Sequence, residues 1–149
     1  MKPETQNIRP AQPADFDQVF NLIRQFASFL NVPEKVHTSV AQMMEEKESF
    51  KCLVAVQDEH VIGFATYFFA YYSWSGKAIY LDDLYVSATN RGQGIGIQLL
   101  DKVIEIGKNE NCKKMRWQVS DWNQKAIEFY KRRGAAVGDG EINCDLSLS

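Results

Sequence analysis

Hydrophobic and polar positions follow two different periods along this chain, and each period predicts one kind of element. From Phe16 to Leu30, hydrophobic residues recur every three or four positions, which predicts an amphipathic helix. Further helices are expected over about 38–47, from residue 95 onward, and from Asn123 to Gly134, where glycine suits a helix C-terminus.

Short hydrophobic runs bounded by polar turns predict the strands. They are expected around Ile8, at 50–57, 61–72, 78–86 and 114–120, and around Ile142–Leu146. Consecutive hairpins favour antiparallel pairing, whereas the strand–helix–strand passage after residue 78 favours a parallel crossover. We therefore expect an α/β (α+β) chain with a central mixed sheet flanked by about four helices, forming one domain over residues 1–149.

Composition excludes several classes of protein. A net charge of −2 provides no basic field, so no nucleic-acid partner is expected. We expect no membrane association, because no apolar stretch approaches the length of a span. The three cysteines, Cys52, Cys112 and Cys144, match neither a disulfide framework nor a metal site, which favours a reducing, cytoplasmic location and no metal.

The stretch "NRGQGIGIQL" (90–99) places glycine at every second position between a strand and a helix. Backbone N–H groups at such a helix start, with the helix dipole, form an anion site suited to a pyrophosphate. A P-loop would need Lys and Ser/Thr after its last glycine, where Ile97 and Gln98 stand. A dinucleotide fingerprint would need glycine at Ile97, so neither pattern fits.

Three segments resemble the GNAT superfamily of N-acetyltransferases. "RGQGIG" fits the acetyl-CoA loop pattern Q/R-x-x-G-x-G/A of that family. "WSGKAIYLDDLYV" and "DWNQKAIEFYKRRGA" resemble its diamine acetyltransferase branch, which includes the spermidine/spermine and thialysine enzymes. The resemblance implies the GNAT fold and direct acetyl transfer from acetyl-CoA to a primary amine of a small cationic acceptor (polyamine-, thialysine- or lysine-like).

The same resemblance assigns the residues on the acetyl-CoA side. Acetyl-CoA is expected to contact Leu84, Tyr85, Val86, Arg91, Gly92, Gln93, Gly94, Ile95, Gly96, Ile97, Asn123, Ala126 and Tyr130. Tyr130 is also the implied general acid, because a phenol pKa of about 10 suits a departing alkyl thiolate. Asn123 is expected to cap the last helix as well.

The acceptor side depends on carboxylates. An alkylamine with a pKa of about 10.4 binds as a cation and must lose a proton before it reacts. Asp82 occupies the position where the family has an acidic residue linked to the base. Strand alternation sends Asp83 to the opposite face unless a bulge intervenes. The resemblance also places Trp74, Trp117 and Gln118 at the acceptor, although either tryptophan could equally be interior packing.

One departure and two alternatives remain open. Polyamine acetyltransferases carry an acid near the end of the first helix, where this chain has Leu30. The chain could also acetylate protein lysines or N-termini, or bind acyl-CoA without catalysis, although Tyr130 and Asp82 together favour an enzyme. The family's homodimers, and an aromatic run at 67–72 larger than one sheet face buries, predict a homodimer.

Overall fold

The computed structural model describes residues 7–138 and 140–148. Within them the strands are β1 (Asn7–Pro10), β2 (Lys51–Gln57), β3 (His60–Tyr72), β4 (Gly76–Val86) and β5 (Lys114–Trp117). The α-helices are α1 (Phe16–Phe29), α2 (Val40–Glu45), α3 (Ile95–Asn109) and α4 (Gln124–Arg132), and short 3-10 turns lie at Pro13–Asp15, Pro33–Lys35 and Ala88–Asn90.

The five strands form one sheet in the order β1-β2-β3-β4-β5. The first four pair antiparallel, and β5 runs parallel to β4 after the crossover through α3. Asp58 and Glu59 make the β2–β3 turn with φ angles of 52° and 66°, a left-handed pair that matches the twist of a tight hairpin. The predicted mixed sheet, with its hairpins and parallel crossover, is confirmed.

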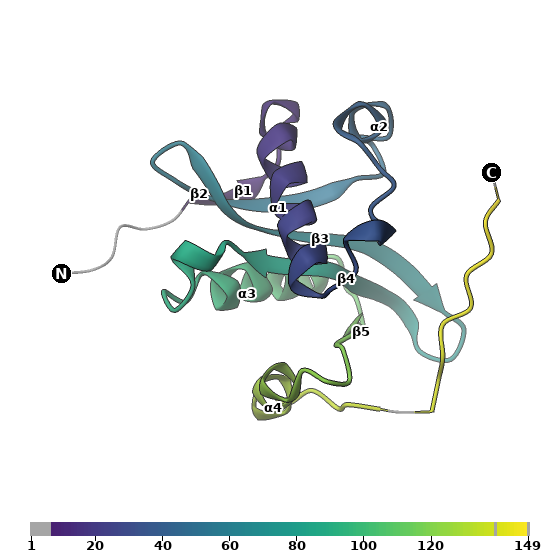
Figure 1. Cartoon of the computed structure of the whole chain (residues 1–149). Helices are drawn as coiled ribbons and strands as arrows, with labels where there is room; N and C mark the ends of the chain where they lie inside the picture. Colours follow the sequence, from purple (N-terminus) through teal and green to yellow (C-terminus); the bar gives the residue numbers. More distant parts are fainter. Residues whose placement is uncertain (1–6, 139, 149) are drawn as a thin grey trace. The chain divides into compact units, whose positions relative to one another are not determined.

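Helices cover both faces of this sheet, with α1 and α2 on one side and α3 on the other (Figure 1). Alternation of side chains along β2 shows why. Leu53 packs in a hydrophobic cluster with Ile95, Leu99, Leu100 and Val103 of α3, called here the α3 cluster. Val54 packs in a second cluster with Phe16, Val19 and Leu22 of α1, called here the α1 cluster. The fit of α3 is close: a Cβ added at Gly107 would lie 2.9 Å from Ile79 Cγ2 on β4. Both faces of β4 are therefore held in place by helices.

The chain forms two compact units that divide between Trp117 and Gln118. The second contains α4, and its residues 140–148 have no helix or strand. The strand predicted around Ile142–Leu146 is therefore wrong. A strand needs a partner for its backbone groups; this stretch pairs with none, and Ile142 and Leu146 are 88% and 85% exposed. One domain over the whole chain stays a prediction.

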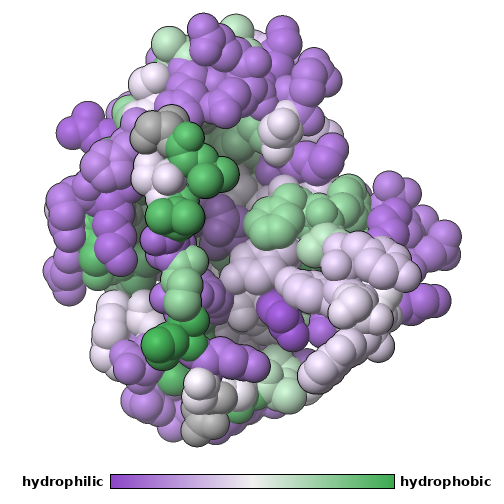
Figure 2. All heavy atoms as spheres, turned by 90° about the vertical axis from the view of Figure 1, so that its right-hand side faces the viewer, coloured by the Kyte–Doolittle hydropathy of each residue, from purple (hydrophilic) through white to green (hydrophobic). Residues whose placement is uncertain are grey.

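Hydrophobic side chains reach the surface on the face drawn in Figure 2. At the tip of the β3–β4 hairpin, Tyr71 is 80% and Trp74 is 100% exposed, while Phe68 lower in β3 is 44% exposed. Interior packing therefore does not explain Trp74. In the part of the chain that the structure describes, each helix is too short or too polar to cross a membrane.

Candidate active site

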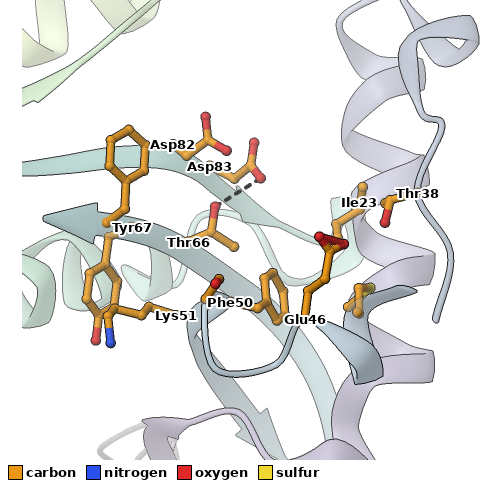
Figure 3. Close-up of a pocket in the computed structure, with 12 residues that line it drawn as sticks. Ile23, Thr38, Glu46, Phe50, Lys51, Thr66, Tyr67, Asp82 and Asp83 are labelled. Atoms are coloured by element: carbon orange, nitrogen blue, oxygen red, sulfur yellow. Dashed lines mark hydrogen bonds between the residues drawn. The ribbon is translucent and has the colours of Figure 1, made fainter. Parts of the chain in front are cut away.

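A β-bulge in β4 places two consecutive carboxylates on the same face of the sheet. Leu81 pairs with Tyr67 of β3 and Asp83 pairs with Thr66, so Asp82 is the extra residue between them. The extra residue reverses the alternation of side chains beyond it. Asp83 therefore leaves the α3 face and joins Asp82 on the face covered by α1 and α2 (Figure 3).

The two carboxylates are electrostatically coupled. Burial and the charge of Asp82 together raise the pKa of Asp83 to about 6, although a hydrogen bond from the Thr66 hydroxyl opposes the shift. That bond is 3.0 Å long, and Thr66 is only 6% exposed. Burial raises the pKa of Asp82 as well. The pair can therefore take up a proton near neutral pH.

Asp82 and Asp83 line a cavity of about 330 Å³, which lies between the sheet and the α1–α2 side (Figure 3). Its volume is at the lower end of the range for small-molecule sites. The cavity is lined by Ile23, Thr38, Met43, Glu46, Ser49, Phe50, Lys51, Thr66, Tyr67, Phe68, Asp82 and Asp83. Much of the wall is apolar, and acidic groups predominate among its charges.

Beyond this bulge, β4 has an edge that β5 does not cover. Among the described residues, β5 pairs with β4 only along Ala78–Leu81, while β4 continues to Val86. The side chains of Leu84 and Val86 pack against the α3 cluster, and Tyr85 packs against α1. Recognition at this edge would therefore use backbone groups, as when an extended ligand adds to a sheet.

The glycine loop that follows has the geometry of an anion cradle. Gly92 and Gly94 have left-handed φ angles of 83° and 79°, and an added Cβ would meet nothing within 4 Å at either. Gly94 is the N-cap of α3, and Ile95 is buried beneath it. The first-turn amides of Ile95, Gly96 and Ile97 have no acceptor within a helix, so they suit a phosphate.

Arg91 is fixed at the start of this loop. Its Nε donates a 3.1 Å hydrogen bond to the Val86 carbonyl. Its guanidinium lies 5.0 Å from the Phe29 ring centroid and 5.2 Å from that of Tyr85. These cation–π contacts tie the end of α1 to the loop. Gln93, two residues further along the loop, is exposed. The contribution of Phe29 was not foreseen from the sequence.

The second unit holds four of the predicted site residues, Gln118, Asn123, Ala126 and Tyr130. The Asn123 side chain accepts a 3.3 Å hydrogen bond from the Ala126 amide, so the predicted helix cap is confirmed. Tyr130 is half-buried on α4, and burial raises the pKa of its phenol. Gln118 Nε2 donates a 2.9 Å hydrogen bond to Asn143 Oδ1.

Comparison with known proteins identifies the family. The model of the protein family described as "Acetyltransferase (GNAT) family" matches residues 16–135 of this chain. The chain belongs to this family. It is 37% identical over 140 residues to a thialysine N-epsilon-acetyltransferase of Mus musculus, covering 86% of this chain and 82% of that protein. It is 34% identical to a human spermidine/spermine N(1)-acetyltransferase-like protein 1, covering 86% of this chain but 20% of that protein.

A solved structure agrees with the family's fold. An aminoglycoside acetyltransferase from a soil metagenomic sample superposes with a TM-score of 0.76 at 18% identity, over 96% of each chain. The predicted GNAT fold and N-acetyltransferase activity toward an amine are thus confirmed by the family. Members of the family use acetyl-CoA as the acetyl donor, and the uncovered β4 edge and the glycine loop fit that donor's extended and anionic parts.

The first unit of this GNAT chain brings only some of the predicted acceptor residues together. Asp82 lines the cavity, whereas Trp74 and Trp117 are not among its lining residues. Trp117 is half-buried against the α3 cluster. Sequence reasoning did not place Asp83 and Thr66 here. The available signal was the pair of consecutive aspartates in an apolar strand, which is costly unless both reach a polar site.

Metal ligands and cysteines are two further kinds of reactive group in the described part of this GNAT chain. Within it, no group of three or more His, Cys, Asp or Glu side chains is placed to hold a metal ion. Cys52 is buried, and desolvation raises the pKa of its thiol well above the usual range. A buried thiol of this kind is a poor nucleophile, so Cys52 is not a candidate to carry an acetyl group.

Proposed function

We propose that this GNAT chain transfers the acetyl group of acetyl-CoA to a primary amine of a small cationic acceptor, which binds in the cavity at Asp82 and Asp83. The observation that carries the proposal is the bulge that turns both carboxylates into this 330 Å³ cavity. Of the relatives named above, one is named as an acetyltransferase of thialysine and the other as similar to an acetyltransferase of spermidine and spermine. Thialysine, spermidine and spermine are small molecules bearing primary amines.

The acidic pair has two roles in this proposal. First, it binds the acceptor as an ammonium ion, because two carboxylates in a partly desolvated cavity attract a cation strongly. Second, it removes the proton that the nitrogen must lose, directly or through water, and passes it to solvent. Asp83, with its pKa at about 6, is mostly ionised at neutral pH and can still be protonated transiently.

The donor side relies on backbone groups. Acetyl-CoA supplies the activated acetyl group. The free edge of Leu84–Val86 would pair with its pantetheine arm, and an amide at this edge would donate to the acetyl carbonyl oxygen as negative charge develops there. The amides of Gly92–Ile97 would hold the pyrophosphate, with Arg91 adding positive charge. The left-handed glycines and the tethered Arg91 support this assignment.

The second unit would complete the chemistry. Tyr130 would donate its phenolic proton to the departing sulfur, and Asn123 and Ala126 would contact the coenzyme at the start of α4. Trp74, Trp117 and Gln118 remain proposed acceptor contacts.

We also propose a homodimer in the cytoplasm. The exposed Phe68 and Tyr71 support a dimer interface. The three free cysteines support a reducing compartment.

The test is a panel of amines assayed for CoA release and for the acetylated product by mass spectrometry. Mono-amines, diamines, lysine analogues and lysine-containing peptides should all be included. Turnover of free amines that exceeds turnover of peptides supports the proposal. Peptide acetylation alone would instead indicate a protein acetyltransferase, and tight acetyl-CoA binding without turnover of any amine would indicate a non-catalytic binding module.

A further inference from the structure

We propose that Phe29 is a positioning residue for coenzyme binding: from the end of α1 it holds the Arg91 guanidinium ready for the pyrophosphate of acetyl-CoA. This inference rests on the proposed function, because it concerns how the glycine loop would hold the coenzyme. It goes further by extending the coenzyme site to α1, the helix that ends at Phe29 and that also carries Ile23 of the acceptor cavity.

Two aromatic rings contact the Arg91 guanidinium. Its central carbon lies 5.0 Å from the ring centroid of Phe29 and 5.2 Å from that of Tyr85, and the two centroids are 6.4 Å apart. Both distances are within the range of a cation–π contact. Tyr85 is 8% exposed and stacks on Phe26 of α1 at 5.1 Å, whereas Phe29 is 45% exposed. The buried Tyr85 therefore supplies a fixed ring, and Phe29 adds a second ring from the surface.

The contacts of Arg91 orient its guanidinium without using the donors that a phosphate needs. Nε donates its hydrogen bond to the Val86 carbonyl at 3.1 Å. A cation–π contact is an attraction between the ring face and the positive charge, and it requires no N–H donor. The two terminal nitrogens of a guanidinium carry four further N–H groups, in the planar fork that binds phosphate oxygens in pairs. The fork is therefore held in place for an anion.

The backbone that leads to Arg91 is anchored as well. The Ser87 amide donates a 2.9 Å hydrogen bond to the Ile62 carbonyl of β3, and the Asn90 amide donates one of 3.0 Å to the Ser87 carbonyl. The Ser87 hydroxyl also donates a 2.6 Å bond to Asn90 Oδ1. Because this turn fixes the backbone, the remaining freedom of Arg91 is that of its side chain, which the Phe29 ring restricts.

Holding the arginine in advance lowers the cost of binding. A long side chain loses rotamer freedom when a ligand immobilises it, and that loss weakens affinity. Here the guanidinium is ordered by the protein itself. Removal of the Phe29 ring should therefore weaken coenzyme binding and leave the chemical step unchanged, since the proposed function assigns neither Phe29 nor Arg91 to the reacting atoms.

The experiment measures CoA binding by isothermal titration calorimetry in wild type, Phe29→Leu, Arg91→Ala and the double variant. In Phe29→Leu the Kd should rise about twofold to fivefold, which corresponds to a cation–π contact at an exposed site. Steady-state kinetics should show this loss in the KM for acetyl-CoA and not in kcat. Arg91→Ala should raise the Kd about tenfold. Adding Phe29→Leu to it should raise the Kd no further, because the ring acts through the guanidinium.

Two further variants are the controls. Phe29→Tyr keeps an aromatic face and should retain the wild-type Kd. Leu30→Ala changes the adjacent C-cap residue of α1, so it shows whether a loosened helix end is enough to weaken binding. Its Kd should also match wild type. Phe29 is 45% exposed, so leucine should leave the chain folded, and the melting temperature of each variant without ligand checks this.

The remaining outcomes separate the inference from the proposed function. An unchanged Kd in Phe29→Leu, an equal rise in either control, or a rise that adds in full to that of Arg91→Ala would overturn the role of Phe29 and leave the proposed function standing. An unchanged Kd in Arg91→Ala would remove Arg91 from the proposed coenzyme site, and the inference with it. CoA binding needs no turnover, so the role of Phe29 is measured even if no amine is acetylated, a result that would overturn the proposed activity alone.

Discussion

The Thr66 hydroxyl donates a 3.0 Å hydrogen bond to Asp83 Oδ2 across the bulge between β3 and β4. This bond stabilises the ionised carboxylate, whereas burial and the neighbouring charge of Asp82 destabilise it. The destabilising influences are larger, so the pKa of Asp83 rises to about 6. The fold therefore keeps an acid at this site that a regular strand would have directed into the apolar layer beneath α3.

Asp83→Asn should stabilise the protein at high pH and have little effect at low pH. The carboxyl has a pKa of about 6 in the folded chain and 3.8 as its ordinary value, so the folded state binds more protons between these two values. The contribution of this carboxyl to the free energy of unfolding is therefore fully present below about pH 4 and is lost as pH rises through about 6. Asparagine carries no charge, so this loss should disappear.

Urea unfolding of wild type and Asp83→Asn at pH 4 and pH 8 measures this effect. The free energy of unfolding of the variant should exceed that of wild type by about 1–3 kcal/mol at pH 8 and be close to it at pH 4. Thr66→Val, which removes the bond that favours the ionised form, should steepen the pH dependence instead. A difference of the same size at both pH values would contradict the raised pKa.

Local patterns in the sequence predicted the elements well, because each depends on neighbours in the chain. The helical spacing from Phe16 and the cap at Asn123 are of this kind, and the structure contains both. The face of Asp83 is different, because it depends on the register between two strands 17 residues apart at the Thr66–Asp83 bond. Alternation within β4 alone contains no information about that register.

Local sequence patterns also fail where a feature depends on residues that are distant along the chain. Ile142 and Leu146 have a strand-like pattern, but pattern alone does not supply a pairing partner, and both are exposed. Glu46 lies in the charged run 45–48, for which the sequence predicted no role. It lines the same cavity as Asp82 and Asp83 of β4, which depends on tertiary structure and not on a local pattern.

Asp82→Asn should slow acetyl transfer most strongly near neutral pH, by roughly tenfold to a hundredfold, since Asp83 remains to bind the amine. The loss should diminish at higher pH, because more of the free amine is then already unprotonated. The measurement is kcat/KM for the best amine from pH 6.5 to 9.5. Asp58→Asn, in an exposed turn whose left-handed φ of 52° asparagine accepts, is the control. A variant with an unchanged pH–rate profile would restrict Asp82 to a structural role.

Gly94→Ala should abolish or greatly reduce the rise in melting temperature that acetyl-CoA causes by mass action. Its φ of 79° is unfavourable for alanine, so the change also costs about 1–2 kcal/mol of stability. Gly134→Ala controls for that strain, because Gly134 has a φ of 92° and equally open space but lies outside the loop. Both variants should lose similar stability, and only Gly134→Ala should retain the full ligand-induced shift. Equal shifts in the two would show that the loop does not hold the coenzyme.

Tyr130→Phe distinguishes an enzyme from a binding module most directly, because it removes only a hydroxyl from a half-buried ring on α4. Burial raises the pKa of this phenol, so it stays protonated at neutral pH and can act as an acid. Loss of a general acid commonly reduces the rate by a factor of about 10²–10⁴, and kcat should fall within that range. The KM for acetyl-CoA should change little, since the proton is needed chiefly in the transition state.

Steady-state kinetics of wild type, Tyr130→Phe and Tyr71→Phe complete this comparison. Tyr71 is 80% exposed in the β3–β4 hairpin, so its substitution controls for the loss of a phenol elsewhere. A fall in kcat of less than about threefold in Tyr130→Phe, with the wild type active, would remove this residue from the mechanism. A fall in kcat, together with an unchanged rise in melting temperature on addition of acetyl-CoA, would show that the hydroxyl serves the chemical step. A residue that only held the coenzyme would reduce that rise in melting temperature as well.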